Sequence, residues 1–542
     1  MMNIKSIKRN LALIIALGAY LLAVVLVLTR PGATLSGDDR IVIRLAHWQI
    51  EEGPREAMVA LVKRYEELNP HIRVEVLAVP GNVYKQWLRT QLIGGNATDI
   101  IEFGSFIGGV NDIPPRFFDP ISQYMELPNP YNGGTPLEGV RWRDTFLDGL
   151  NTPDTYIENL SNYYAVTLCM VNMRLFYNPE LLEEISGSPV PPNSYFGMLD
   201  LGEKLVQRTA ETKQRISLYA GSQFNGIILM EQLLARAGLG LTMFNDRYRE
   251  QGLISRDAAV EFLRGNWTYR NPELLNGMEQ MRQTATNMRP GFQQLERDAA
   301  MQEFLRGQAV MIATGTWDAT SLIRLAPFKV GVTVLPWPTK QDGEIGRYNW
   351  APVSEGAGGT AMPFYLNKTS PHKKEAMDLL HFMTSVEGNT LFVEQSGWLP
   401  SIREVAVPDY AQVYLHRFDG FVARTAYLRG FGGETRELWD RQMYHLTSAT
   451  GSVPEFLAAF EDKFPDALKR DLRIDLHNMY LSLRRDIPSL TAQATLDRLE
   501  YSEIPSAQLW KNRESGQNIT EAKIYEAQAV LEKGPAIDAS SN

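Results

Sequence analysis

The chain has very little cysteine and histidine for its length. It contains one cysteine, Cys169, and seven histidines among 542 residues. A single cysteine cannot form an intrachain disulfide, and neither residue type is dense enough to suggest a structural zinc site. We therefore expect no metal and no cofactor. Cys169 lies in an apolar run, which predicts a buried thiol rather than a reactive one.

The sequence also lacks an excess of basic charge and the common catalytic motifs. It carries 54 Lys and Arg against 63 Asp and Glu, a formal net charge of −9, which argues against a nucleic-acid partner. No G-x-S-x-G, P-loop, H-E-x-x-H or G-x-G-x-x-G motif is present. Acidic neighbours such as Glu51 and Glu52 leave a glycosidase as the enzyme alternative, but adjacent carboxylates point in different directions. The sequence therefore favours a binding protein over an enzyme.

One long uncharged run stands near the N-terminus. Lys5, Lys8 and Arg9 precede residues 11–28, which carry no charge. A positive stretch followed by an apolar segment directs a chain through a membrane, and this segment is just long enough to span one. Since no good cleavage site follows, we expect an uncleaved anchor, with a cleaved signal peptide as the alternative. Either way the rest of the chain is expected in a bacterial periplasm or at the cell surface.

Alternating strand and helix patterns follow a short polar tether at 31–40. Strand patterns at 41–46 and 72–77 flank a helix pattern at 54–68, and a third strand pattern lies at 99–105 after another helix. The order β-α-β-α-β predicts a parallel sheet covered by helices. The chain is therefore expected to begin, after its tether, with an α/β lobe.

The segment at 304–336 is the most informative part of the chain. A helix and a turn lead into the apolar strand at 309–313, and a Gly-Thr-Trp corner precedes a second helix and strand. Gly315 and Thr316 predict a tight turn at the strand end, with Trp317 where the chain opens to solvent. Ligands of open α/β sheets collect at the carboxyl ends of strands, and a large aromatic there suits a sugar ring.

This segment resembles a block of the family 1 extracellular solute-binding proteins, the group that includes the maltose-binding protein. Phe304, Gly307 and Trp317 occupy the block's positions, and the following Gly-Val-Thr-Val-Leu-Pro run resembles the family's hinge strand. Further blocks are similar in the same order: Asp-Ile-Ile at 99–101, Tyr177-Asn178, Pro191-Pro192, the helix at 373–384 and Gly397 to Pro400. The resemblance spans about residues 41 to 468 and implies a two-lobed α/β fold of the type II periplasmic-binding class.

The expected domains follow from these blocks. They are a signal-anchor at 1–30, the tether at 31–40, a first lobe at 41–162 and 335–384, a helix-rich second lobe at 163–334 and 385–470, and a helical C-terminal extension at 471–542 with a disordered end. Crossings near Tyr163, Val332 and Thr384 would join the lobes. Ligand would bind between them, and closure about the hinge would trap it.

The candidate ligand-binding residues lie at strand ends and turns, where loops present side chains to a cleft. Aromatic plates and a polar rim together suit a sugar, which has an apolar ring face and a polar edge. The candidates are Trp48, Gln49, Glu51, Tyr84, Phe103, Gly104, Ser105, Asn225, Thr316, Trp317, Asp318, Gly358, Gly359 and Trp398. Glu102 is a further candidate for the rim. No catalytic or metal-binding residue is expected.

The resemblance implies a function as well as a fold. It implies a monomeric receptor that captures a carbohydrate, an oligosaccharide by expectation, and delivers it to the membrane permease of an ABC importer. Polyol, glycerol-phosphate and peptide ligands stay open as alternatives. A receptor of the same fold that senses a ligand or acts as a scaffold for a membrane complex is a second class of function.

Overall fold

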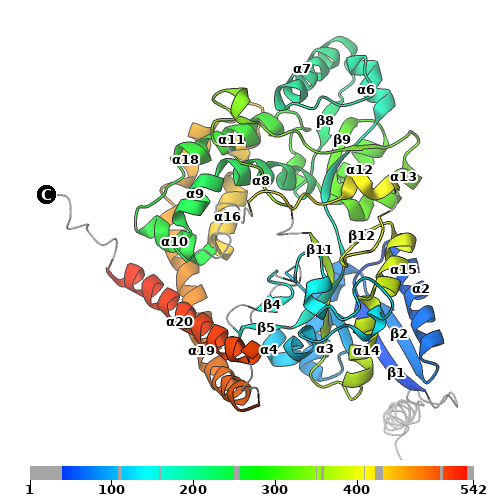
Figure 1. Cartoon of the computed structure of the whole chain (residues 1–542). Coiled ribbons are helices and arrows are strands. Elements are labelled where there is room, and N and C mark those ends of the chain that lie inside the picture. Colours follow the sequence, from blue (N-terminus) through cyan, green and yellow to red (C-terminus); the bar gives the residue numbers. More distant parts are fainter. Residues whose placement is uncertain are drawn as a thin grey trace, which may run out of the picture.

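Two sheets organise the chain into two α/β domains (Figure 1). The computed structural model describes residues 40–533, apart from 106, 108–112, 151, 158–159, 249–254, 350, 356–358, 408, 422–430 and 501–503. The first domain has a six-stranded sheet in the order β12-β6-β11-β3-β1-β2, and the second has a four-stranded sheet in the order β10-β7-β9-β8. The predicted architecture of two α/β lobes is confirmed.

The first sheet starts with the parallel strands that the sequence predicted. Its strands are β1 (Ile41–His47), β2 (Ile72–Ala78), β3 (Ile100–Glu102), β6 (Ala165–Met170), β11 (Thr360–Leu366) and β12 (Leu399–Pro400). β1 pairs in parallel with β2 and with β3, whereas β11 pairs antiparallel with β3 and β6. The sheet is therefore mixed, because strands from much later in the chain complete it.

Helices cover this sheet through narrow apolar stripes. The main ones are α2 (Glu52–Leu68), α3 (Gly81–Gly94), α14 (Lys373–Met383) and α15 (Val386–Ser396), with the short α4 (Ile113–Phe117), α5 (Ser122–Met125) and the hairpin of β4 (Tyr156–Ile157) and β5 (Asn162–Tyr163) beside them. On α2, Ala57, Met58, Leu61 and Tyr65 are each at most 1% exposed and share one core with Ile43 and Leu45 of β1. The spacing of this stripe is that of one helix face.

The second domain is richer in helix. Its strands are β7 (Met173–Tyr177), β8 (Ser217–Ala220), β9 (Ala309–Gly315) and β10 (Gly331–Thr333). Its helices are α6 (Pro179–Ser186), α7 (Tyr195–Thr212), α8 (Asn225–Ala237), α9 (Leu239–Asn245), α10 (Ser255–Leu263), α11 (Pro272–Ala285), α12 (Arg297–Leu305), α13 (Ala319–Leu325), α16 (Gly433–Gln442), α17 (Tyr444–Thr447) and α18 (Val453–Phe460). The strand-corner-helix order predicted at 304–336 is confirmed by α12, β9 and α13.

Two parts of the predicted domain division differ from the packing. The sequence places residues 385–470 in the second lobe, but α15 packs in the core of the first domain and β12 pairs with β6. Residues 335–384 were assigned to the first lobe, but Asn276 and Gln280 of α11 in the second domain donate hydrogen bonds to the carbonyls of Glu344 and Ile345, each 2.9 Å. Sequence blocks show where elements begin and end, whereas burial decides which core an element joins.

Asn389 is the polar residue that fixes α15 to the first sheet. Its Nδ2 donates to the carbonyl of Leu168 in β6 at 2.6 Å, and its Oδ1 accepts from the backbone of Ser401 at 3.2 Å. Asn389 is fully buried. The Asn389 amide thus fixes α15 relative to β6 and β12, because the buried carbonyl of Leu168 and N–H of Ser401 would otherwise lack a hydrogen-bond partner.

We expect the Asn389→Ala variant to be less stable by about 2–3 kcal/mol, since it leaves buried backbone groups without partners. Urea unfolding followed by circular dichroism measures the change. The matched control is Asn82→Ala, which removes the same side chain from an exposed position of α3 and should change little. Equal stability of the two variants would contradict the role given to Asn389.

Three segments join the two domains. The first is the Val171-Asn172 step between β6 and β7, the second lies between β10 and β11, and the third lies between β12 and α16. The predicted crossing near Tyr163 is thus displaced toward the C-terminus, because β6 still belongs to the first sheet. The crossing predicted near Thr384 comes after β12, since α15 stays with the first domain.

The ends of the chain were predicted as an anchor and a helical extension. α19 (Phe464–Glu500) and α20 (Ile504–Lys533) are the predicted C-terminal helices, and α19 begins before residue 471. The anchor at 1–30 and the end predicted to be disordered, 534–542, lie outside the described residues. Within the described part, no single helix has the length and apolar character to cross a membrane, and one bent pair, Asn225–Ala237 with Leu239–Asn245, meets that test by length and composition.

Candidate functional site

A cleft of about 660 Å³ lies between the two domains. The first domain contributes the turn after β1 and the start of α2, and the second contributes the start of α12 and the corner that leads from β9 into α13. The lining residues are Ile50, Glu51 and Arg55 on one side and Arg297, Asp298, Met301, Asp318, Ser321, Arg324 and Leu325 on the other. The carboxyl ends of β1 and β9 both lead into it, as expected for ligand sites in α/β sheets.

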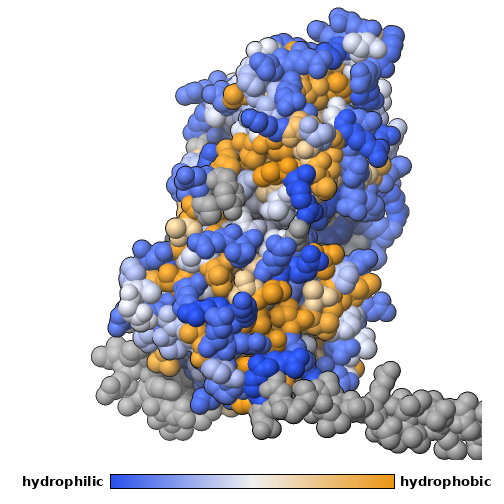
Figure 2. Space-filling model, turned by 90° about the vertical axis from the view of Figure 1, so that its right-hand side faces the viewer, coloured by the Kyte–Doolittle hydropathy of each residue, from blue (hydrophilic) through white to orange (hydrophobic). Residues whose placement is uncertain are grey.

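Figure 2 shows the face of the molecule that carries α2, α12, α13 and α15, with apolar areas on both domains and a more hydrophilic band between them. Ile50 and Val59 are exposed on the first domain, and Ile323 and Leu325 are exposed on the second. Another hollow, of about 650 Å³, follows the outer face of α3 within the first domain. We take the interdomain cleft as the candidate site because both domains contribute to it.

Arg297 and Asp318 form the polar wall of the cleft on the second domain. The Arg297 guanidinium donates to Asp318 Oδ1, and Thr314 Oγ1 donates to Asp318 Oδ2 at 2.5 Å. Burial raises the pKa of Asp318, and the nearby Arg297 offsets this only in part. Phe224 and Trp317 flank the guanidinium at 5.6 and 5.9 Å from their ring centroids. The wall thus combines hydrogen-bonding groups with two aromatic rings.

Trp317 is held by its own turn. The ring lies over Gly315, where an added Cβ would come within 2.1 Å of it, and it also packs against the core of the first domain. The sequence predicted that Gly315 serves a tight turn through its backbone freedom. Its φ of −77° is open to any residue, so the glycine is required by the close approach of the ring instead. Trp317 is partly buried and reaches across the interface between the domains.

The first-domain wall rests on a buried carboxyl group. Glu102, at the end of β3, is fully buried and accepts from the backbone of Trp48 at 2.9 Å and from Gln49 Nε2 at 2.6 Å. Burial is the main reason that its pKa rises to about 8. Glu102 and Gln49 therefore fix the turn after β1 from beneath. Glu51 follows that turn and lines the cleft.

Three predicted aromatic plates lie in the hydrophobic cores. Tyr84 and Phe103 are fully buried, and Trp398 is 2% exposed. Phe103 packs edge-on against Tyr365 at 5.2 Å, Trp48 packs edge-on against Tyr84 at 5.3 Å, and Trp398 packs against Phe392. These rings shape the domains and present almost no surface. The sequence does not distinguish one aromatic residue at a turn from another. Only the packing of the folded chain shows which rings can contact a ligand and which belong to the core.

The remaining predicted residues hold the backbone in place. Asn225 is buried and donates to the carbonyl of Ala313 at 2.8 Å, and Thr316 accepts from the backbone of Asn172 at 3.1 Å. Ser105 is exposed, with its N–H donating to Asp154 at 2.7 Å beside Gly104. Gly359 lies where a Cβ would collide with His416. Gly358 lies outside the described residues.

The structure thus brings Glu51 and Asp318 together in the cleft, with Trp317 next to Asp318. It adds lining residues that the sequence did not single out: Ile50, Arg55, Arg297, Asp298, Met301, Ser321, Arg324 and Leu325. Arg297 and Asp298 were missed because they begin a helix that precedes β9, whereas the prediction considered residues that follow strands. No local pattern marks them.

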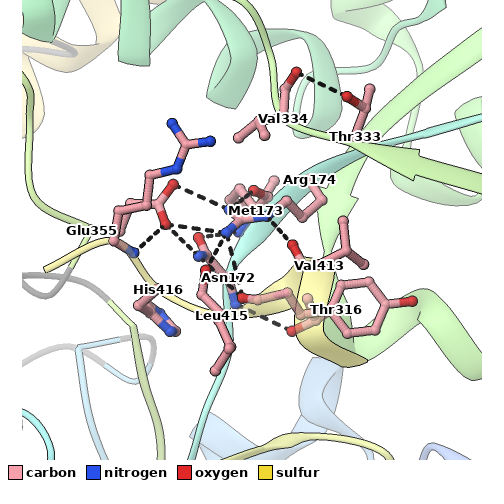
Figure 3. A network of polar contacts seen from close by, with 12 residues as sticks. Asn172, Met173, Arg174, Thr316, Thr333, Val334, Glu355, Val413, Leu415 and His416 are labelled. Atoms are coloured by element: carbon pink, nitrogen blue, oxygen red, sulfur yellow. Dashed lines mark hydrogen bonds and ion pairs between the residues drawn. The ribbon is translucent and has the colours of Figure 1, made fainter. Parts of the chain in front are cut away.

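A buried ion pair lies where the domain crossings meet (Figure 3). Arg174 of β7 and Glu355, which precedes β11, are paired through Nη1 and Nη2 at 3.1 and 3.2 Å, with side chains 2% and 17% exposed. Arg174 also donates to the carbonyls of Val413 and Leu415 at 2.9 and 2.6 Å. Asn172 Nδ2 donates to Glu355 at 2.7 Å. One network therefore ties together residues from all three crossings.

Comparison with known proteins identifies the family. Three solved structures align over nearly their whole length. A chitin oligosaccharide binding protein has 16% sequence identity and a TM-score of 0.53, and the alignment covers 80% of this chain and 99% of that one. The cyclic alpha-maltosyl-1,6-maltose binding protein of Arthrobacter globiformis has 15% identity and a TM-score of 0.54 (80% and 100% covered), and the GacH receptor of Streptomyces glaucescens has 17% identity and a TM-score of 0.52 (79% and 99% covered). At these identities the likeness shows the fold. A search of curated proteins gives no match.

The match to a family model confirms the resemblance noted in the sequence. Residues 60–414, well over half of the chain, match the model for bacterial extracellular solute-binding proteins. The matched residues include β9, which ends at the cleft, and the ion pair of Arg174 and Glu355 at the crossings. The chain belongs to the bacterial extracellular solute-binding protein family.

Proposed function

We propose that the protein captures an oligosaccharide in the interdomain cleft and delivers it to the membrane permease of an ABC importer. Members of its family are extracellular substrate receptors and not enzymes, which confirms the expectation of a binding protein in the periplasm or at the cell surface. The glycosidase alternative is thereby dropped. An N-terminal anchor would keep the receptor at the membrane, close to its permease.

The observation that carries the proposal is the composition of the cleft. Carboxylates and guanidinium groups from both domains face a space of about 660 Å³, and Trp317 and Phe224 flank Arg297 on one wall. Sugar hydroxyls both donate and accept hydrogen bonds, so they can use acidic and basic side chains at once. Ring faces pack on aromatic side chains. The aligned structures named above include proteins whose names specify oligosaccharide ligands.

Ligand that contacts both walls would stabilise a closed arrangement of the domains. The three crossings allow such a rotation, since each is a segment that leaves the first domain on one side and enters the second on the other. A ligand shifts this equilibrium only by its differential affinity for the two arrangements. Glu51 and Arg55 on one side and Arg297 and Asp318 on the other are placed to supply that difference.

A thermal-shift screen with mono- and oligosaccharides tests the ligand class, because a ligand specific for the folded state raises the melting temperature. We expect an oligosaccharide to give a shift, and the Trp317→Ala variant to bind it about 10- to 100-fold more weakly by calorimetry. Trp87→Ala, on α3 and away from the cleft, is the matched control. A shift from peptides or polyols, with none from sugars, would reject the carbohydrate proposal while leaving the receptor fold intact.

A further inference from the structure

The helices α19 and α20 form an antiparallel pair that extends beyond the part of the chain matched by the family. The family match ends at residue 414, and the aligned solved structures, covered almost completely, account for about 80% of this chain. Figure 1 shows the pair projecting from the second domain and running along the side of the molecule to the level of the first domain. The pair therefore lies outside the residues that the family model matches.

The base of the pair is firmly part of the second domain. Phe464, Leu468, Leu472 and Leu476 of α19 occupy one face, are at most 6% exposed, and share a core with α16 and α18. On α20, Ile524 and Ala527 are buried in the same core. Side chains at positions i, i+4 and i+8 form a continuous stripe on a helix, so the pair is attached along several turns.

Ion pairs reinforce this attachment. Lys523 of α20 lies 3.2 Å from Asp257 of α10, with side chains 7% and 14% exposed, and Arg256 lies 2.5 Å from Asp475 of α19. Partly buried pairs such as these are costly to break, because separation leaves a charge with poor solvation. The base should therefore move with the second domain as one body.

The other end of α19 contacts the first domain. Leu490 is 4% exposed and belongs to the hydrophobic cluster formed by Tyr84, Leu88, Leu92 and Ile113, all of the first domain. At the helical rise of 1.5 Å per residue, Leu490 lies about 33 Å along the helix from Leu468 in the second-domain core. One continuous helix thus connects both cores outside the three crossings.

The attachment at the far end is an apolar contact. The base is held by several apolar residues and ion pairs, and at the far end the buried Leu490 joins the first-domain cluster. Because the base moves with the second domain, a rotation at the hinge displaces Leu490 relative to the first domain, and an apolar contact is lost once its atoms separate by more than about 4.5 Å. The Leu490 contact can therefore exist only over a narrow range of interdomain angles.

From this we infer that α19 and α20 form an arm that holds the two domains at the interdomain angle of this structure through the contact of Leu490. Any large change of that angle, including closure on a ligand, must break or shift this contact. Ligand binding and release of the arm are then coupled. The inference concerns the ligand-free protein, so it does not depend on the ligand being a sugar.

The test measures the interdomain distance in the full chain. Spin labels are placed at exposed positions on each domain, Lys63→Cys on α2 and Glu203→Cys on α7, with Cys169→Ala in the background, and distances are measured by pulsed electron paramagnetic resonance. We expect one narrow distribution, and we expect Leu490→Asp to broaden it or move its mean by several ångströms. Ile474→Asp is the matched control, because Ile474 is 58% exposed on the same helix near the base and should leave the distribution unchanged.

A distribution for Leu490→Asp that coincides with that of the parent protein would overturn the inference. Should Leu490→Asp fail to fold by circular dichroism, Leu490→Ala decides in its place, since it removes most of the apolar contact without adding a charge. The experiment uses no ligand. Its failure is therefore distinct from failure of the sugar screen, which would concern the proposed function alone.

Discussion

Replacing Arg174 by methionine is expected to lower the free energy of unfolding by about 3–5 kcal/mol, because it leaves a largely buried carboxylate without its cation. Arg174 is 4% exposed and bonds both to Glu355 and to the carbonyls of Val413 and Leu415. In a domain of this size such a loss corresponds to a fall of roughly 6–20 °C in melting temperature. Thermal unfolding followed by circular dichroism measures it.

The matched control is Arg441→Met. Arg441 pairs with Glu437 on α16, but both side chains are about two-thirds exposed, at 66% and 68%, so its loss should have little effect. The double variant Arg174→Met with Glu355→Gln should recover part of the loss, since it removes the uncompensated charge as well. A melting temperature for Arg174→Met within a degree of the parent protein would show that the network contributes nothing.

The same ion pair predicts a dependence on acid. Burial raises the pKa of Glu355, but Arg174, the N–H of Arg417 and Asn172 outweigh it and hold the pKa below its ordinary value. Because the pKa is lower in the folded protein, the stabilisation is present above the ordinary pKa of a glutamate and is lost as the pH falls through the folded value. Arg174→Met should remove this part of the acid sensitivity.

Replacing Glu102 by glutamine is expected to remove a loss of stability that the parent protein suffers as the pH rises. Burial raises the pKa of Glu102 to about 8, from 4.5. Between these values the folded protein holds a proton that the unfolded chain has released. The unfolded state then binds fewer protons, so stability falls by about 1.4 kcal/mol per pH unit, or about 5 kcal/mol over the whole interval.

Urea unfolding from pH 5 to pH 8 provides the test. The free energy of unfolding of the parent protein should fall relative to that of Glu102→Gln, which carries no ionisable group at this position. The variant should also lose part of one hydrogen bond near Trp48 or Gln49, about 1 kcal/mol at every pH, because an amide cannot accept through both of its heavy atoms. Glu437→Gln, an exposed change, should follow the parent protein. Parallel curves for Glu102→Gln and the parent would refute a protonated Glu102.

Much of the first domain could be predicted from local pattern. The stripe of Ala57, Leu61 and Tyr65 repeats at helical spacing, and β1, β2 and β3 alternate with helices in the order that a parallel sheet requires. The order of the blocks around Trp317 sufficed to indicate the family, since β9 begins at the predicted Ala309 and α13 follows the predicted corner, although β9 continues to Gly315. Each of these features depends on residues close together in the chain.

The candidate site could be predicted only in part. Glu51, Trp317 and Asp318 follow strands that end at the cleft, and strand ends are visible in the sequence. Tyr84, Phe103 and Trp398 have the same local setting and yet are buried, because partners distant in sequence, such as Tyr365 for Phe103, cover them. Arg297 reaches the cleft only because α12 packs beside the corner after β9.

The sequence by itself determined the α/β character, the receptor family and the helical nature of residues 471–500 and 504–533, because hydrophobic periodicity and residue spacing are local properties. The tertiary structure alone decided which domain α15 joins and which aromatic rings lie in the core. It also decided that Arg174 bonds to residues of the other two crossings. It also decided that Leu490 reaches the first domain. These are contacts between residues far apart in the chain, and their free energy comes from mutual burial, which no short stretch of sequence specifies.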